Sequence, residues 1–131
     1  MSDEFQRTYS GAPWESQVGY CRAIKAGKHI YVTGTAPVND KGETFAPGNA
    51  YGQTGKCLEI IDNALKELGA TLSDVVRTRL FVTDISRWKE YGQAHHETFK
   101  DHPPATTMVE VNSLISPDML IEVEAVAYLD E

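Results

Sequence analysis

The chain has 131 residues, 41% of them hydrophobic, and a formal net charge of -7 at pH 7, which predicts one domain spanning residues 1–131 with a real core and no room for a second. Because this acidic balance repels a phosphate backbone, general nucleic-acid binding is not expected. No run of about 18 apolar residues occurs and the first twenty residues are polar, so we expect neither a membrane span nor a signal peptide and predict a cytoplasmic protein.

The first third of the chain predicts an arm followed by a hairpin. Residues 1–19 lack periodicity and contain a Ser-Gly-Ala-Pro turn signal, so we expect an N-terminal arm laid over the domain and anchored by Trp14. Residues 20–26 and 29–33 both alternate between apolar and polar side chains across a glycine turn, which predicts a hairpin. A second turn signal at residues 39–42 predicts a short strand after it.

The middle of the chain switches between helical and strand periodicity. From residue 51 to 68 apolar side chains recur every three or four positions, and Gly69 follows as a stop signal, which predicts a helix. Residues 76–82 alternate and predict a strand in which Val76 and every second residue after it face the core. Ser86 is a cap for a second helix, which a proline pair ends. The buried stripe predicted for this helix consists of Trp88, Tyr91, His95 and Phe99.

Two further strands are predicted near the C-terminal end. Residues 106–111 and 121–127 alternate, and each run has one apolar face and one face that carries carboxylates. Both connections from a helix to the next strand are short, which favours two helices side by side on one face of a single mixed sheet. The expected fold class is therefore α+β.

The sheet face that the helices leave open carries most of the candidate functional residues. Mixed charge with interleaved aromatic and methionine side chains is typical of a self-association surface that encloses small clefts, although an ordinary solvated face fits the pattern equally well. A homo-oligomer closed by rotational symmetry is the simplest way to cover such a face. The residues predicted to lie on it are Tyr20, Arg22, Arg77, Arg79, Phe81, Met108, Glu110, Glu122 and Glu124.

No motif indicates a metal site or a nucleophile. Cys21 and Cys57 lack C-x-x-C spacing, so two buried free thiols are expected, with a disulfide as the alternative. His95 and His96 lie about 100° apart around the axis of the predicted helix, and we expect His95 to be a packed core residue instead of a metal ligand. The chain contains no G-x-S-x-G elbow, glycine-rich phosphate loop or H-E-x-x-H, so serine hydrolase, nucleotide-binding and zinc-protease functions have no support.

Four segments carry a resemblance to a known family. They are IYVTGTAPV at residues 30–38, VRTRLFVTD at 76–84, PATTMVEV at 104–111 and IEVEA at 121–125. With these segments the chain resembles the reactive intermediate deaminase family, also called Rid, YjgF-like or endoribonuclease L-PSP, over residues 20–128.

The resemblance implies a fold, an assembly and a chemistry. The fold would be chorismate-mutase-like, in a homotrimer whose three sheets form a central barrel with clefts between neighbouring subunits. Typical members hydrolyse reactive imines and enamines to 2-keto acids and ammonia without a metal or a cofactor. The implied partners are a small-molecule ligand and further copies of the same chain.

The family's site residues carry over with one departure. In active members the proline-alanine pair is followed by an arginine that binds the substrate carboxylate; Thr106 stands there in this chain, and a hydroxyl does not replace a guanidinium. The chain thus resembles a branch that lacks the arginine. Met108 stands where many relatives have cysteine. The other matching positions are Tyr20 for the cleft tyrosine, Thr33 and Gly34 for the small polar strand end, and Glu122 for the glutamate that positions the attacking water.

The charged candidates each have two interpretations. Glu122 is either the catalytic base, which takes a proton from water, or one half of an interface ion pair. Arg22 and Arg79 either supply a relocated cation for an anionic ligand or form structural ion pairs with Glu110 and Glu124.

Three functions follow from these alternatives. The first is a cofactor-independent hydrolase of an imine, an enamine or a related small metabolite in inter-subunit clefts. The second is a non-catalytic trimer that binds a metabolite or another protein. The third, an endoribonuclease, comes only from a label attached to the family, and the acidic composition counts against it.

Overall fold

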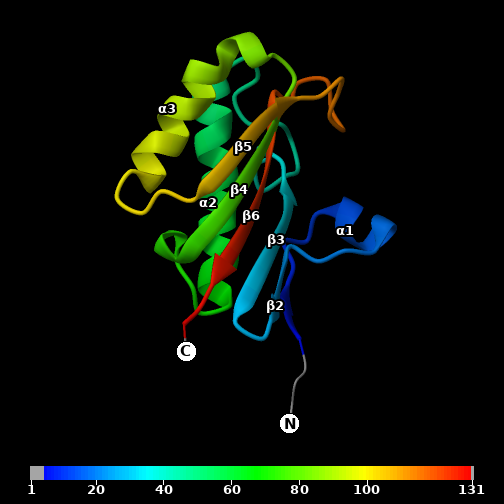
Figure 1. The fold of residues 1–131 in the computed structure, drawn as a ribbon. Coiled ribbons are helices and arrows are strands. Elements are labelled where there is room, and N and C mark those ends of the chain that lie inside the picture. Colours follow the sequence, from blue (N-terminus) through cyan, green and yellow to red (C-terminus); the bar gives the residue numbers. More distant parts are fainter. Residues whose placement is uncertain (1–4, 131) are drawn as a thin grey trace.

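A single six-stranded mixed sheet forms the centre of the protein (Figure 1) in a computed structural model that describes residues 5–130. The strands are β1 (Gln6–Thr8), β2 (Ala23–Ala26), β3 (His29–Thr35), β4 (Val75–Val82), β5 (Ala105–Glu110) and β6 (Ile121–Tyr128). Their order across the sheet is β1-β2-β3-β6-β4-β5. All neighbouring strands are antiparallel except β4 and β5, which are parallel.

Two long helices, α2 (Ala50–Glu67) and α3 (Trp88–Phe99), lie together on one face of this sheet (Figure 1). Short 3-10 turns precede β4 (Leu72–Asp74) and α3 (Ile85–Arg87). The predicted α+β class is confirmed. The opposite face of the sheet is left open by both helices. Within the described residues, no helix has the length and apolar character needed to cross a membrane.

Helix α2 forms where its periodicity predicts it. The side chain of Asn49 caps the first turn by accepting a hydrogen bond from the backbone N–H of Gly52 at 2.8 Å. Its buried face, which includes Ile61 and Leu65, packs on the sheet. Gly69 follows with a φ of 87°, a left-handed conformation that ends the helix at little cost only for glycine.

Helix α3 buries a shorter stripe than predicted. Tyr91 and Phe99 are fully buried, and His95 packs against the Phe99 ring with centroids 4.6 Å apart. Trp88 was predicted to belong to the stripe, but its side chain is 54% exposed. Trp88 is the first residue of α3, and the contacts with the core begin one turn later, at Tyr91.

Two β-bulges change which side chains face the core. In β4 the pairing with β6 shifts between Val75 and Arg77, so Val75 is buried while Val76 is 49% exposed. The prediction that Val76 faces the core was therefore wrong. In β3 the pairing with β6 shifts between Val32 and Thr35, which leaves Thr33 and Gly34 out of register. Bulges of this kind re-aim side chains, and they are frequent next to active sites.

The edge strand β5 presents the opposite face to the one predicted. Thr106, Met108 and Glu110 pair with the inward-facing Thr78, Leu80 and Val82 of β4. Strand partners point to the same side of a sheet, so Met108 and Glu110 lie on the helix side and not on the open face. Most of β5 is exposed on both faces, so the alternation of its side chains did not reveal which face covers the core.

The N-terminal arm contains regular structure. Residues 1–4 of the predicted arm lie outside the described residues. The remainder forms β1, which extends the sheet, and a short helix α1 (Pro13–Val18). Trp14 is only half-buried, whereas Glu15 is 4% exposed and is the arm's buried anchor. Residues 20–22 precede β2, so the first hairpin strand is shorter than predicted. The predicted short strand after residue 42 is a single bridge between Val38 and Thr44.

Candidate functional site

Glu122 stands beside the β3 bulge on the open face of the sheet. Its neighbours in β6, Ile121 and Val123, are fully buried on the helix side, so the Glu122 side chain points the other way. The carboxylate lies directly over the bare Cα of Gly34. A Cβ built on Gly34 would clash with Oε2 of Glu122 and would lie 3.1 Å from its Cδ. The missing side chain at Gly34 therefore makes room for the carboxylate.

The carboxylate of Glu122 is half-buried and has no neutralising contact of its own. Among the residues that the structure describes, no hydrogen bond or ion pair involves its oxygens. Burial raises the pKa of Glu122, the nearby carboxylate of Glu124 raises it as well, and the guanidinium of Arg22 lowers it. A partly desolvated carboxylate with a raised pKa is a stronger base than an ordinary surface glutamate.

Arg22 is the cation beside Glu122, and each of its two terminal nitrogens donates a hydrogen bond within the chain, whereas Nε makes an ion pair without a hydrogen bond. Nη1 donates to the hydroxyl of Thr35 at 3.1 Å, and Nη2 donates to the carbonyl oxygen of Gly34 at 3.2 Å. Nε lies 3.4 Å from Oε2 of Glu15. The Glu15 carboxylate in turn accepts from the backbone N–H of Ser10 at 3.0 Å. The Arg22 side chain is only 10% exposed, so it is a fixed internal charge.

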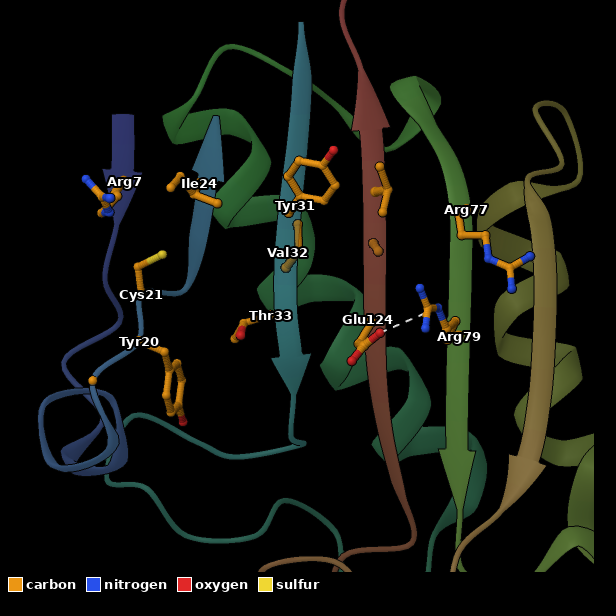
Figure 2. Close-up of a pocket in the computed structure, with 13 residues that line it drawn as sticks. Arg7, Tyr20, Cys21, Ile24, Tyr31, Val32, Thr33, Arg77, Arg79 and Glu124 are labelled. Carbon is orange, nitrogen blue, oxygen red and sulfur yellow. Dashed lines mark ion pairs between the residues drawn. The ribbon is translucent and has the colours of Figure 1, made fainter. Parts of the chain in front are cut away.

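A hollow of about 410 Å³ opens on the same face, between the N-terminal arm and the central strands (Figure 2). We call it the open-face hollow, and Tyr20, Thr33, Arg79 and Glu124 line it. The Tyr20 ring lies over the guanidinium of Arg22, with 6.0 Å between the ring centroid and Cζ. Arg79 and Glu124, which both line the hollow, form an ion pair with Nε 3.6 Å from Oε1 (Figure 2). This pair was one of the two roles predicted for Arg79.

Thr106 and Met108 lie on the other side of the sheet. The Thr106 hydroxyl is 2.8 Å from the hydroxyl of Thr78, which is 2.9 Å from Nε2 of His95 on α3. Met108 packs against the hydrophobic core. Burial lowers the pKa of His95. The structure therefore separates these two predicted binding residues of the chain from the rest.

Five of the predicted residues do come together. They are Glu122, Gly34, Arg22, Tyr20 and Thr33. The residue that sequence reasoning missed is Glu15, which neutralises Arg22. Pro13 followed two residues later by an acidic side chain is the start signal of a helix and could have revealed α1, but nothing in that signal points to Arg22.

Comparison with known proteins places the chain in a family. A family model described as endoribonuclease L-PSP matches residues 11–129. The chain belongs to the endoribonuclease L-PSP family. This family includes proteins called YjgF-like and Rid, so the resemblance that the four sequence segments indicated is confirmed.

Relatives within the endoribonuclease L-PSP family share both sequence and fold with this chain. A protein of this family from Mycobacterium tuberculosis has a solved structure with a TM-score of 0.87 and 44% identity, covering 96% of this chain and 100% of that one. An uncharacterized protein of Streptomyces coelicolor is 34% identical over 97% of this chain and 94% of its own length. A protein of Acinetobacter baylyi named 3-aminoacrylate deaminase RutC is 34% identical over 84% of this chain and 86% of its own length.

Proposed function

We propose that this protein is a hydrolase that adds water to the C=N bond of a small imine, or of an enamine after it tautomerises, with Glu122 as the general base. The observation that carries the proposal is the state of Glu122, a half-buried carboxylate with a raised pKa and no partner among the described residues. The 34% identity to a protein named as a deaminase of an enamine supports the same chemistry.

The reaction requires a base at the site of water attack and donors around the substrate. Ionised Glu122 accepts a proton as the water oxygen bonds to the C=N carbon, which gives a carbinolamine. Glu122 then returns this proton to nitrogen. The C–N bond breaks with its electron pair on nitrogen as the hydroxyl proton of the carbinolamine passes to nitrogen, and a carbonyl compound and ammonia leave. In this proposal Tyr20 and Thr33 supply hydrogen bonds from the open-face hollow, and the charge of Arg22 keeps a share of Glu122 ionised.

Self-association is part of the proposal. The open face is covered by neither long helix, and we expect a homotrimer to enclose it in clefts between subunits. Strand β5 is at the edge of the sheet, so a neighbouring subunit would bring its own edge strand to the cleft. Thr106 and Met108 would then contribute to the site of the adjacent subunit, although they turn away from Glu122 in their own.

The test is competition for a reactive imine. An oxidase generates the imine in place, semicarbazide traps what is not hydrolysed, and the trapped fraction is measured with and without protein. We expect the wild type to lower the trapped fraction and Glu122→Gln to lose about a hundredfold in rate or more. Glu59→Gln, a change on the exposed side of α2, is the matched control and should behave as the wild type. Equal rates for Glu122→Gln and the wild type would remove Glu122 as the base.

A second candidate function is binding without turnover, either of a metabolite or of another protein. The residue that favours it is Thr106, which stands where the family resemblance implies an arginine in active members. A ligand that raises the melting temperature and is recovered unchanged would support this function. The family description also contains the word endoribonuclease, but the net charge of -7 opposes RNA binding; lack of RNA binding at both low and high salt would exclude it.

A further inference from the structure

We infer that the substrate is a C=N compound without a carboxylate, bound as the iminium cation. This inference rests on the proposed hydrolase function and specifies its substrate class. It comes from the distribution of charge around Glu122, where each described arginine of the open face is either offset by a neighbouring carboxylate or far from Glu122.

The nearest cation does not present a free binding edge. A guanidinium recognises a carboxylate by pointing two N–H groups at its two oxygens. In Arg22 one terminal nitrogen donates to Thr35 and the other to the carbonyl of Gly34, at 3.1 and 3.2 Å, while Nε faces the carboxylate of Glu15 at 3.4 Å. A substrate carboxylate would therefore have to compete with the Glu15 carboxylate and with these two acceptors inside a largely buried network.

The remaining described arginines of the open face do not replace it. Arg79 is paired with Glu124. Arg77 turns toward the sheet edge, where it donates to the hydroxyl of Thr107 at 3.1 Å (Figure 2). It pairs in register with Val126, four residues along β6 from Glu122 and so roughly 13 Å away at the rise of a strand.

Arg7 lies at the same distant end of the open-face hollow. It pairs with Ile24 of β2, which pairs with Tyr31 of β3, which pairs with Val126 of β6. Its guanidinium lies 5.8 Å from the centroid of the Phe5 ring, and Figure 2 shows it at the outer edge of the hollow. Within residues 5–130, then, no unpaired arginine lies near Glu122.

The charge balance at the base therefore favours a cation. Arg22 and Glu15 cancel, and ionised Glu122 leaves the site with one negative charge. A carboxylate placed beside it would be repelled in a partly desolvated setting, whereas an iminium group would be attracted. The net charge of -7 acts in the same direction over longer distances. The π face of Tyr20, which already lies over one cation, is a second surface suited to positive charge.

The iminium form also matches the chemistry. The overall reaction is R₂C=NH₂⁺ + H₂O → R₂C=O + NH₄⁺. The water oxygen forms a bond to carbon while Glu122 takes one water proton and then delivers it to nitrogen. The C–N bond breaks with its electron pair on nitrogen, and the second water proton passes from the new carbonyl oxygen to the departing ammonia, which gives NH₄⁺. A protonated C=N carbon is more electrophilic than a neutral one, so a single carboxylate base suffices and no co-reactant is needed.

The experiment compares two imines that differ only in the carboxylate. A flavin-dependent amine oxidase acting on 2-phenylethylamine gives the imine without it, and an L-amino-acid oxidase acting on phenylalanine gives the imine with it. Butylamine and norvaline give a second matched pair of imines, with a smaller side chain. The readout is the protein's acceleration of hydrolysis over the uncatalysed rate of each imine, from competition with semicarbazide.

The outcomes separate this inference from the proposed function. We expect at least a tenfold greater acceleration for the imines without a carboxylate. Equal or greater acceleration for the amino-acid imines would overturn the inference and leave the hydrolase intact. If the protein accelerates the hydrolysis of none of the four imines, both the hydrolase function and this inference are overturned.

A variant tests the cause of the selectivity. Glu15→Gln keeps the shape of the side chain and an oxygen for Ser10 but removes the charge that neutralises Arg22. We expect Glu15→Gln to reduce the preference for the imine without a carboxylate by about tenfold, mainly through a lower KM for the amino-acid imine. A folded Glu15→Gln protein with unchanged preference would refute the role given to this pair, while the wild-type comparison stands if the variant fails to fold.

Discussion

Replacing Gly34 by alanine is expected to damage the site much more than the fold. A Cβ at this position would meet Oε2 of Glu122 at clashing distance and Cδ at 3.1 Å, with Cγ at 3.5 Å. The obstacle is the far end of a flexible side chain and not backbone, so the carboxylate moves and the strands stay. Restoring ordinary contact requires Oε2 to move by roughly 1 Å, and a misplacement of this size costs about a hundredfold in rate.

The stability of Gly34→Ala follows from two opposing contributions. Gly34 does not have a positive φ, so alanine is compatible with the backbone and loses less entropy on folding, a gain of about 0.4–1 kcal/mol. Moving Glu122 off its preferred rotamer costs about 0.5–1.5 kcal/mol. The free energy of unfolding should thus change by less than about 1 kcal/mol, which is a shift in melting temperature of about 4 °C or less for a chain of this size.

The assay is imine competition together with thermal unfolding. Gly55→Ala is the matched control, because a Cβ there meets nothing within 4 Å on the exposed side of α2, and it should raise stability by about 0.5–1 kcal/mol without affecting turnover. A pKa titration of Glu122 by NMR gives a readout that needs no substrate, since displacement toward water should bring its pKa down toward the ordinary value. Full activity and an unchanged Glu122 pKa in Gly34→Ala would show that the carboxylate does not occupy this position.

Three further predictions concern charge and pH. Activity should require ionised Glu122, so the acid limb of kcat/KM against pH lies above the ordinary glutamate pKa; Glu124→Gln removes a charge that raises this pKa and should move the limb to lower pH. The pKa of Glu122 is raised because the folded state disfavours its charge, so ionisation of Glu122 lowers the free energy of unfolding as pH rises through its folded pKa. Glu122→Gln should therefore be neutral or stabilising by up to about 1 kcal/mol in urea unfolding at pH 7. Clear destabilisation would contradict this. Burial lowers the pKa of His95, so the stability that neutral His95 contributes is present above about pH 6.5 and is lost as pH falls toward its folded pKa. Between pH 7.5 and 5.5 the free energy of unfolding in urea should therefore fall less for His95→Gln than for the wild type.

Periodicity predicted the elements of this fold but not the local faults in their pairing. Helix α2 and strand β6 were predicted because each buries one regular face against a single layer. Val76 was misplaced because a bulge inserts one residue and reverses the alternation from that point. Met108 was misplaced because both faces of an edge strand are partly exposed, so its direction depends on the partner strand and not on its own pattern.

The candidate site, like the fold, could be predicted only in part from the sequence. Glu122, Tyr20 and Thr33 were predicted as site residues from their residue types and the family resemblance, and the structure places them on the same face of the sheet. The state of Arg22 could not be found, because it depends on a carboxylate seven positions earlier that a six-residue helix brings back to it. Such long-range pairing leaves no periodic trace, and a buried arginine that is neutralised has the same sequence signature as one that is free to bind a ligand.

One irregularity in β3 accounts for both halves of the site. The shift between Val32 and Thr35 takes Gly34 out of register, so its carbonyl oxygen is free to accept from Arg22 while its bare Cα leaves space for Glu122. A regular strand would direct that carbonyl into the ladder with β6. The bulge thus gives Arg22 a carbonyl acceptor and, at the same point, leaves the carboxylate of Glu122 without a partner. An unpartnered carboxylate lowers stability, so a site built this way is better explained by chemistry at Glu122 than by the needs of the fold.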